Sequence, residues 1–388
     1  MNINKNEIKF IYSQDEETEK RKQKGITLIA LVITIIILLI LAGISISALT
    51  NQWLFKNAKL AQNATEKAET EQGQRLNEYE DEINKYLSNN DKTEETLVDK
   101  VNDGTIKIGD YVKYTPNTAS TDSILQELNT YSGSDKNTTS TLTQESLNWR
   151  VLDIKDGQVR LISELPTTST ITLSSYNGYN NAVKLLDDTC STLYTNKQLA
   201  SKVQNIKIED IQDKMVETDY SKFDSNYGKK FTPTIKYYPN ILIKEKEQKV
   251  NGTAGTELGL SEQTELINQT TKTQATSLEI KYTYWNKTMT TTDFKDSKYY
   301  ELFINNGSNY STYWMSSRCI GVASNVAGFT VRLVSTGTVN VYRLCNSNGY
   351  EIPNVYAFRP IITLNSNVQI DTANSGNGST AEQAYIIK

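Results

Sequence analysis

Apolar residues are distributed unevenly along the chain, and the first apolar stretch is the longest. It runs without a charge from Ile26 to Ile44, and as a helix these 19 residues span about 28 Å, close to the hydrocarbon thickness of a membrane. Four basic residues between positions 20 and 24 stand directly before it, which favours the cytoplasm for that side. The pattern therefore predicts a cytoplasmic leader at 1–25 and a single transmembrane helix at 26–50, with the rest of the chain outside the cell.

A helical pattern continues beyond the apolar run and predicts a stalk helix at 51–90. Proline is absent from it, and good helix formers dominate. Apolar residues recur there at three- and four-residue steps, at Leu76, Tyr79, Ile83, Tyr86 and Leu87. Such a face would pack on the body of the protein, and a stalk that only spaces the body from the membrane is the alternative. Polar residues at 91–104 predict a linker.

From residue 105 the pattern changes to short stretches rich in Val, Ile, Thr and Tyr, which predict strands. The strand candidates are 106–114, 148–163, 313–318, 326–344 and 356–364. The second is expected to be a hairpin that turns at Asp156 and Gly157, and the spacing at 178–203 predicts one or two helices. We therefore expect an α+β fold, in which the long N-terminal helix precedes a loop-rich extracellular domain with antiparallel sheet.

The boundaries expected for this domain are 105 and 370. A polar region without a strong period, at 212–281, predicts an irregular insertion with short strands or hairpins. The tail at 371–388 contains Asp, Asn and Gly residues that could hold calcium or form a flexible end. Because its carboxylates are not regularly spaced, a flexible end is favoured.

The composition excludes several classes of enzyme, chiefly because the 388 residues contain no histidine. This excludes Ser-His-Asp and Cys-His nucleophilic pairs and histidine-ligated zinc, so we expect no enzyme, no cofactor and no metal site. A formal net charge of −4 predicts no nucleic-acid partner. Of the three cysteines, Cys319 and Cys345 lie in one region that would face an oxidising exterior, where a disulfide can form, and Cys190 would be left over.

The junction before the apolar run carries the sharpest motif of the chain. Lys24 and Gly25 precede the run, and Ile26, Thr27 and Leu28 open it. This junction resembles the prepilin processing site, where a prepilin peptidase cuts after the glycine and the new N-terminus is methylated. The resemblance covers about the first 60 residues and implies a type IV pilin-like protein of the cell membrane, with other pilin-like subunits as partners. A cleaved secretory signal and an uncleaved anchor are the alternatives.

The sequence departs from that family at position 30. Most pilins carry a glutamate five residues after the cut, thought to pair with the terminal amine of a neighbouring subunit inside the filament. Ala30 cannot make this pair. We therefore expect a minor or tip pilin, an adhesive structural component, or a surface protein anchored alone, rather than the major subunit. A ligand-binding receptor module on an uncleaved anchor is the alternative function.

Several phrases of the body carry a second resemblance. IKIGDYVKY, NWRVL, GYNNAV, YWMSSR and YAFRPIITL resemble an uncharacterised family of extracellular domains in surface proteins of Gram-positive bacteria. Those domains look related to C-type-lectin-like and formylglycine-generating-enzyme folds, and the match covers residues 104–365 in broken pieces. The resemblance implies that the NWRVL and RPIITL strands are neighbours. It does not transfer the cysteine-dependent oxidation of the enzyme relatives.

Two of these phrases hold candidate ligand-binding residues. Tyr313, Trp314 and Arg318 lie in YWMSSR, and Arg359 precedes Pro360. Aromatic faces suit a sugar or a peptide and a planar guanidinium suits a carboxylate, so a glycan or a protein would be the ligand. The competing interpretation places Trp314 in the core and makes Arg359 a buried hydrogen-bonding strut, and this interpretation is favoured.

Overall fold

A computed structural model describes residues 33–38, 76, 79, 95–118, 122–134, 142–243, 249–250, 253–254, 261–305, 312–323 and 325–388. By its internal contacts the chain divides into two units, Met1–Thr93 and Glu94–Lys388. Each unit is described by itself.

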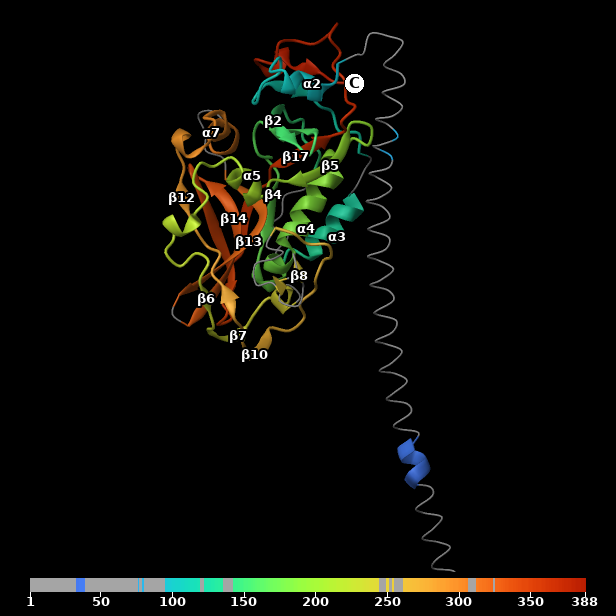
Figure 1. The fold of residues 1–388 in the computed structure, drawn as a ribbon. Coiled ribbons are helices and arrows are strands. Elements are labelled where there is room, and N and C mark those ends of the chain that lie inside the picture. Colours follow the sequence, from blue (N-terminus) through green and yellow to red (C-terminus); the bar gives the residue numbers. More distant parts are fainter. Residues whose placement is uncertain are drawn as a thin grey trace, which may run out of the picture. The chain divides into compact units, whose positions relative to one another are not determined.

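The described residues of the first unit are helical. Residues 33–38 form the helical segment drawn in blue in Figure 1, and Leu76 and Tyr79 also have helical backbone. Their large apolar side chains are exposed, from 46% at Ile35 to 62% at Tyr79. Among the residues described here, none belongs to a helix long and apolar enough to cross a membrane. The rest of the predicted leader, transmembrane helix and stalk lies outside the described residues.

Two mixed six-stranded sheets form the framework of the second unit, which confirms the α+β class (Figure 1). The first sheet has the order β18 (Tyr385–Ile386), β1 (Tyr111–Lys113), β2 (Trp149–Lys155), β3 (Gln158–Ser163), β17 (Pro360–Leu364), β5 (Ala200–Asn205). The second has the order β12 (Lys287–Thr288), β15 (Thr338–Asn346), β14 (Val326–Ser335), β13 (Tyr313–Ala323), β16 (Asn354–Ala357), β4 (Thr170–Leu173). Among the described pairings within these sheets, β1–β18 and β13–β16 are parallel and the others antiparallel.

Shorter elements complete the unit. The helices are α2 (Leu97–Asn102), α3 (Asp122–Thr130), α4 (Ser175–Tyr194), α5 (Ile208–Gln212) and α7 (Lys298–Phe303), with 3-10 turns at Tyr220–Lys222, Thr291–Asp293 and Ala381–Gln383. Within the region expected to be an irregular insertion, the paired strands are β7 (Thr234–Tyr237) with β10 (Thr273–Ser277), β6 (Lys230–Phe231) with β11 (Ile280–Lys281), and β8 (Lys249–Val250) with β9 (Thr253–Ala254). The expected short strands are therefore present.

The hairpin β2–β3 turns where the sequence predicts. Asp156 and Gly157 have φ values of 52° and 75°, the left-handed conformation that a type I′ turn requires at both central positions. β3 then pairs with β17, Ile162 facing Ile361. β3 therefore lies between the NWRVL and RPIITL strands, so the expectation that these two strands are direct neighbours is wrong.

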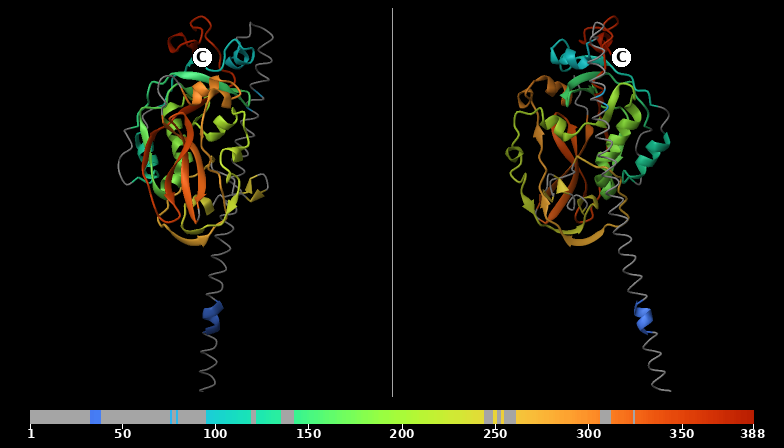
Figure 2. Two further views of the ribbon diagram at one scale, coloured as in Figure 1. Left: turned by 90° about the vertical axis from the view of Figure 1, so that its left-hand side faces the viewer. Right: turned by 45° about the vertical axis from the view of Figure 1, so that its right-hand side comes forward.

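Helix α4 is the central element of the larger core cluster. Its buried side chains include Tyr179, Leu186 and Cys190, and it packs against β5 and the β13–β15 strands (Figures 1 and 2). Gly178 permits the close approach of the 132–133 turn, because a Cβ there would lie 2.7 Å from the carbonyl oxygen of Ser132. Of the one or two helices expected at 178–203, one is present, and residues 200–205 form β5, which pairs with β17.

Both ends of the second unit are more ordered than the sequence suggests. Within the expected linker, Thr96 and Asp99 form a capping box at the start of α2, and Leu97 is buried. The backbone N–H of Leu97 donates to the carbonyl of Val368 at 2.8 Å, so this segment is bound to the body. The tail is not a flexible end, because it closes the first sheet as strand β18 and buries Ile387.

Candidate functional site

The candidate ligand-binding residues of the YWMSSR phrase are in the protein interior. Trp314 is fully buried on β13, and its indole N–H donates to the carbonyl of Ile171 at 3.0 Å. Tyr313 is 1% exposed, and its hydroxyl donates to the carbonyl of Phe303 at 2.6 Å. Neither aromatic face is open to a ligand, so the core interpretation of Trp314 fits the geometry, and Tyr313 is buried beside it on β13.

Arg359 is fully buried and bonds two other segments of the backbone, at 163–164 and at Phe303. Its guanidinium donates to the carbonyl oxygen of Ser163 at 2.9 and 3.1 Å and to that of Glu164 at 2.8 Å, and its Cζ lies 5.3 Å from the centre of the Tyr313 ring. Burial lowers the pKa of this arginine. The side chain is thus the hydrogen-bonding strut that the competing interpretation describes.

Arg318 has the same character, at 2% exposed. It donates to the carbonyl oxygens of Asn180 and Glu262, both at 3.3 Å, and lies 5.6 Å over the ring of Tyr179. The guanidinium therefore ties β13 to helix α4 and to the 261–263 segment. The four predicted ligand-binding residues do not form a groove open to solvent.

The disulfide that the sequence allows is absent from the structure, because Cys190, Cys319 and Cys345 are all free and buried. Cys319 on β13 faces Thr330 of β14, whereas Cys345 on β15 faces the adjacent residue of β14, Phe329. The two thiols therefore lie about two strand spacings apart, roughly 10 Å, and point to opposite faces of the sheet, whereas a disulfide needs Cα atoms within about 7 Å. Burial also raises the pKa of all three thiols, which suppresses the reactive thiolate.

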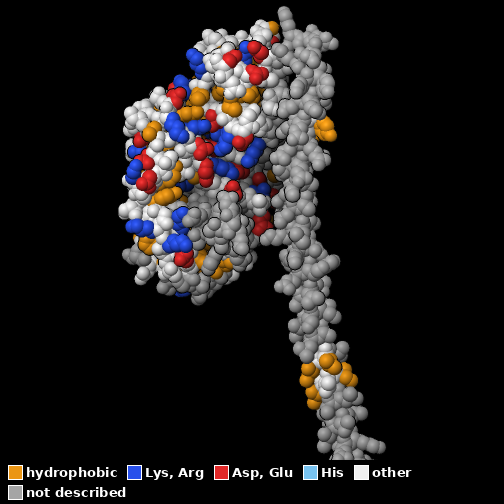
Figure 3. Space-filling view, viewed as in Figure 1, with side chains coloured by type: hydrophobic (Ala, Val, Ile, Leu, Met, Phe, Trp, Pro, Cys, Tyr) orange, Lys and Arg blue, Asp and Glu red, His pale blue; other side chains and the backbone are white. Residues whose placement is uncertain are grey.

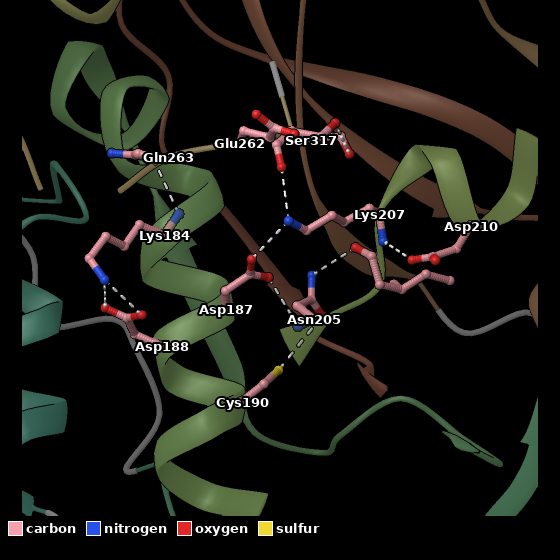
Figure 4. Close-up of polar contacts among 12 residues, drawn as sticks. Lys184, Asp187, Asp188, Cys190, Asn205, Lys207, Asp210, Glu262, Gln263 and Ser317 are labelled. Carbon is pink, nitrogen blue, oxygen red and sulfur yellow. Dashed lines mark hydrogen bonds and ion pairs between the residues drawn. The ribbon is translucent and has the colours of Figure 1, made fainter. Parts of the chain in front are cut away.

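A polar cluster links helix α4 to strand β5 and to the segment that follows it (Figure 4). The Asp187 carboxylate accepts the backbone N–H of Asn205 at 3.1 Å and lies 3.1 Å from the ammonium group of Lys207. Lys207 also donates to the carbonyl of Ser261 at 2.9 Å. Burial raises the pKa of Asp187 although Lys207 opposes this shift.

The same cluster offers no activated nucleophile. The sulfur of Cys190 lies 3.9 Å from the side-chain oxygen of Asn205, which itself accepts the backbone N–H of Arg359 at 2.7 Å. Asn205 further donates to the carbonyl of Trp314 at 3.0 Å. These contacts fasten α4, β5 and β13 to one another, and the chain contains no imidazole that could act as a base.

A second charged cluster holds the β2–β3 hairpin to α5. The Arg160 guanidinium donates to Asp153 at 2.6 and 2.7 Å and to Asp210 at 2.5 Å, and Lys214 lies 2.6 Å from Asp153. Burial opposes ionisation of Asp153, yet the two cations outweigh it and hold the pKa of that carboxyl below its ordinary value of 3.8. The groups neutralise one another, as buried charges must.

The surface charges of the second unit are mixed in sign. Figure 3 shows Lys and Arg side chains interspersed with Asp and Glu on the face in view, without a large patch of one sign. Within the described part of the chain, no group of three or more Cys, Asp or Glu side chains is placed to hold a metal ion.

The structure contains an open groove that the sequence does not predict. It has a volume of about 800 Å³ and lies over one end of the β13–β14–β15 strands, where Tyr282, Tyr284 and Arg343 line it. The available sequence signal was Gly328 inside the predicted strand 326–344, since an internal strand glycine marks a place of close approach. Gly321 lies beyond the predicted strand 313–318 and gave no such signal.

Comparison with known proteins identifies one feature, at the N-terminus. Residues 20–46 match the prokaryotic N-terminal methylation motif. This motif characterises type IV pilin-like proteins, implies processing by a prepilin peptidase, and includes Lys24, Gly25, Ile26, Thr27 and Leu28. These five residues lie outside the described residues. No curated protein and no solved structure matches the chain.

Proposed function

We propose that the chain is a minor or tip subunit of a type IV pilus-like filament, cut by prepilin peptidase between Gly25 and Ile26. The observation that carries the proposal is the N-terminal methylation motif at residues 20–46. Cleavage at this point removes the charged leader and leaves Ile26 as the new N-terminus. The apolar run that begins there anchors the subunit in the membrane and packs in the filament.

The exposed apolar side chains of residues 33–38 support an assembled role. Ile33, Ile36 and Leu38 are each at least half exposed, and a row of such side chains is unfavourable in water. Lipid or the helices of neighbouring subunits would cover them. Ala30 supports a minor position in the filament, since it lacks the carboxylate that a repeated subunit would use to pair with its neighbour.

The second unit is the displayed part of the subunit. Its start and its end are both bonded to the same short segment, with Thr96 bridging Gln369 and Ile387 bridging Ile370. A single attachment to the N-terminal segment therefore suffices to present the whole unit. A ligand-binding receptor on an uncleaved anchor is the second candidate, and the groove lined by Tyr284 and Arg343 favours it.

A pair of glycine variants tests the proposal in the native host. Gly25→Val should block cleavage, so the chain keeps its leader and is lost from filaments sheared off the cells. Gly43→Val, in the apolar run, is the matched control and should be processed. In sheared wild-type filaments the chain should be far less abundant than the main subunit. A Gly25→Val chain that enters filaments like the wild type would contradict the proposal.

A further inference from the structure

The groove over the β13–β14–β15 strands has two paired glycines in its floor. Gly321 of β13 and Gly328 of β14 face each other directly in the sheet. Neither carries a side chain, and both are half-buried, with Tyr284 beside Gly321 and Arg343 beside Gly328. Glycine inside a strand weakens it, and such a position often marks the close approach of a ligand. Thr330 continues the floor along β14.

Two tyrosines form one side of the groove and are held in place. The backbone N–H groups of Thr283 and Tyr284 both donate to the carbonyl of Ile320, at 2.9 and 3.2 Å, so the 282–284 segment is bonded to β13. The Tyr282 hydroxyl donates to Asp224 at 2.8 Å. The Tyr282 and Tyr284 rings are 6.0 Å apart and nearly perpendicular. Fixed rings of this kind offer contact area at little cost in conformational entropy.

Arg343 on β15 forms the opposite side and differs from the other arginines described. Of the six arginines in the described part of the chain, five are at most 5% exposed. Arg343 is exposed, its side chain runs over Gly328, and its guanidinium lies 5.7 Å from the ring of Tyr350. No carboxylate among the described residues forms an ion pair with it. A β-bulge at this point of β14–β15 sets its direction.

We infer that this groove binds a carboxylate-bearing sugar unit of a glycan. The Arg343 guanidinium would hold the carboxylate through two parallel hydrogen bonds, and one face of the sugar ring would lie over the two glycines against Tyr284. The exposed amide of Asn348 is placed at the rim to bond hydroxyl groups. A volume of about 800 Å³ is within the usual range for small-ligand sites, about 300–1,000 Å³.

This inference gives the displayed unit of the proposed subunit an adhesive role. The inference rests on the proposed function only for the place where the unit is displayed, because sugar binding at the groove requires neither cleavage nor a filament. The groove can therefore bind sugar when processing at Gly25 fails, and processing can occur when the groove binds no sugar.

Calorimetric titration of the full chain in detergent tests the inference. The probes are a tetrasaccharide of alternating glucuronate and N-acetylglucosamine, the same compound with its carboxylates methyl-esterified, and sialyl-lactose. We expect at least one acidic sugar to bind, and the methyl ester to bind about tenfold more weakly or not at all, because esterification removes the negative charge that the guanidinium would bind. Binding should weaken as salt is raised.

Variants then locate the bound sugar. Arg343→Ala and Tyr284→Ala should each weaken binding about tenfold or more. Gly321→Ala should also weaken it while leaving the fold intact, because the added Cβ meets only ordinary contacts, 3.6 Å from Tyr284. Lys113→Ala removes an exposed charge from β1 and serves as the matched control, with unchanged binding expected.

Four outcomes would overturn the inference. These are the absence of binding by both acidic sugars, equal binding of the methyl ester, wild-type affinity in Arg343→Ala, and binding of a tetraglutamate peptide as tight as that of either sugar. The thermal unfolding temperature of each variant, measured alongside, confirms that a loss of binding is not a loss of folding.

Discussion

Ile387, directly after strand β18, allows a prediction about the stability of the second unit. Replacing Ile387 by alanine should destabilise the second unit, because this side chain is 8% exposed and belongs to its core. The residue bridges Ile370, and the backbones of Gln369 and Lys388 exchange hydrogen bonds of 3.0 and 3.1 Å beside it. The variant removes three buried carbons and leaves a cavity at the rim of the core.

The magnitude follows from the burial and from the size of the unit. Isoleucine-to-alanine changes in cores cost about 2–5 kcal/mol, and a site at the rim belongs near the lower end, at about 2–3 kcal/mol. The 295 residues from Glu94 to Lys388 (388 − 94 + 1) give an unfolding entropy of about 0.6 kcal/mol/K. The unfolding temperature should therefore fall by about 3–5 °C.

Thermal unfolding of the purified chain in detergent, followed by tryptophan fluorescence, measures this shift. Gln383→Ala is the matched control, since Gln383 lies in the same tail with an exposed side chain. We expect that control within about 0.5 kcal/mol of the wild type. If Ile387→Ala also stays within that limit, the tail is not part of the sheet and the reasoning is refuted.

Three further predictions concern the interior. Asp153→Asn should cost about 3 kcal/mol at pH 7, because it removes one partner of a buried ion pair. Because folding lowers the pKa of Asp153, the ionised carboxylate stabilises the folded state above pH 3.8. This stabilisation is lost as the pH falls below 3.8, so the free energies of unfolding of the variant and the wild type, measured in urea, should converge at low pH. Denatured, unreduced protein should take up three alkyl groups, whereas a single one would reveal a disulfide. Trp314→Phe should cost about 1–3 kcal/mol in urea unfolding, because the Ile171 carbonyl loses its donor, and an unchanged midpoint would contradict this.

Local patterns predict the elements that depend on local chemistry. The Asp156-Gly157 turn, the helical spacing around Leu186 and the C-terminal strands are all found in the structure, because turn conformation and periodicity are properties of neighbouring residues. The buried states of Trp314 and Arg359 were also favoured by the sequence. The hydrogen-bond partners of these two side chains were not predicted, because the carbonyl groups that accept from them are more than 140 residues away in the sequence.

Features that depend on distant pairing could not be read from the sequence. The polar tail joins the first sheet only because β1 offers it an edge, and the expected linker is helical where Leu97 is covered by the body. Cys319 and Cys345 are near in sequence, yet β14 separates them. The groove likewise requires the 282–284 segment to lie beside glycines about 40 residues further along the chain.

The N-terminus of the mature protein tests the central claim most directly. Intact mass and terminal sequencing of the chain from native membranes should give an N-terminus at Ile26 that carries one methyl group on the terminal amine. An intact Met1, or an N-terminus beyond the apolar run after Ile44, would contradict the pilin-like account.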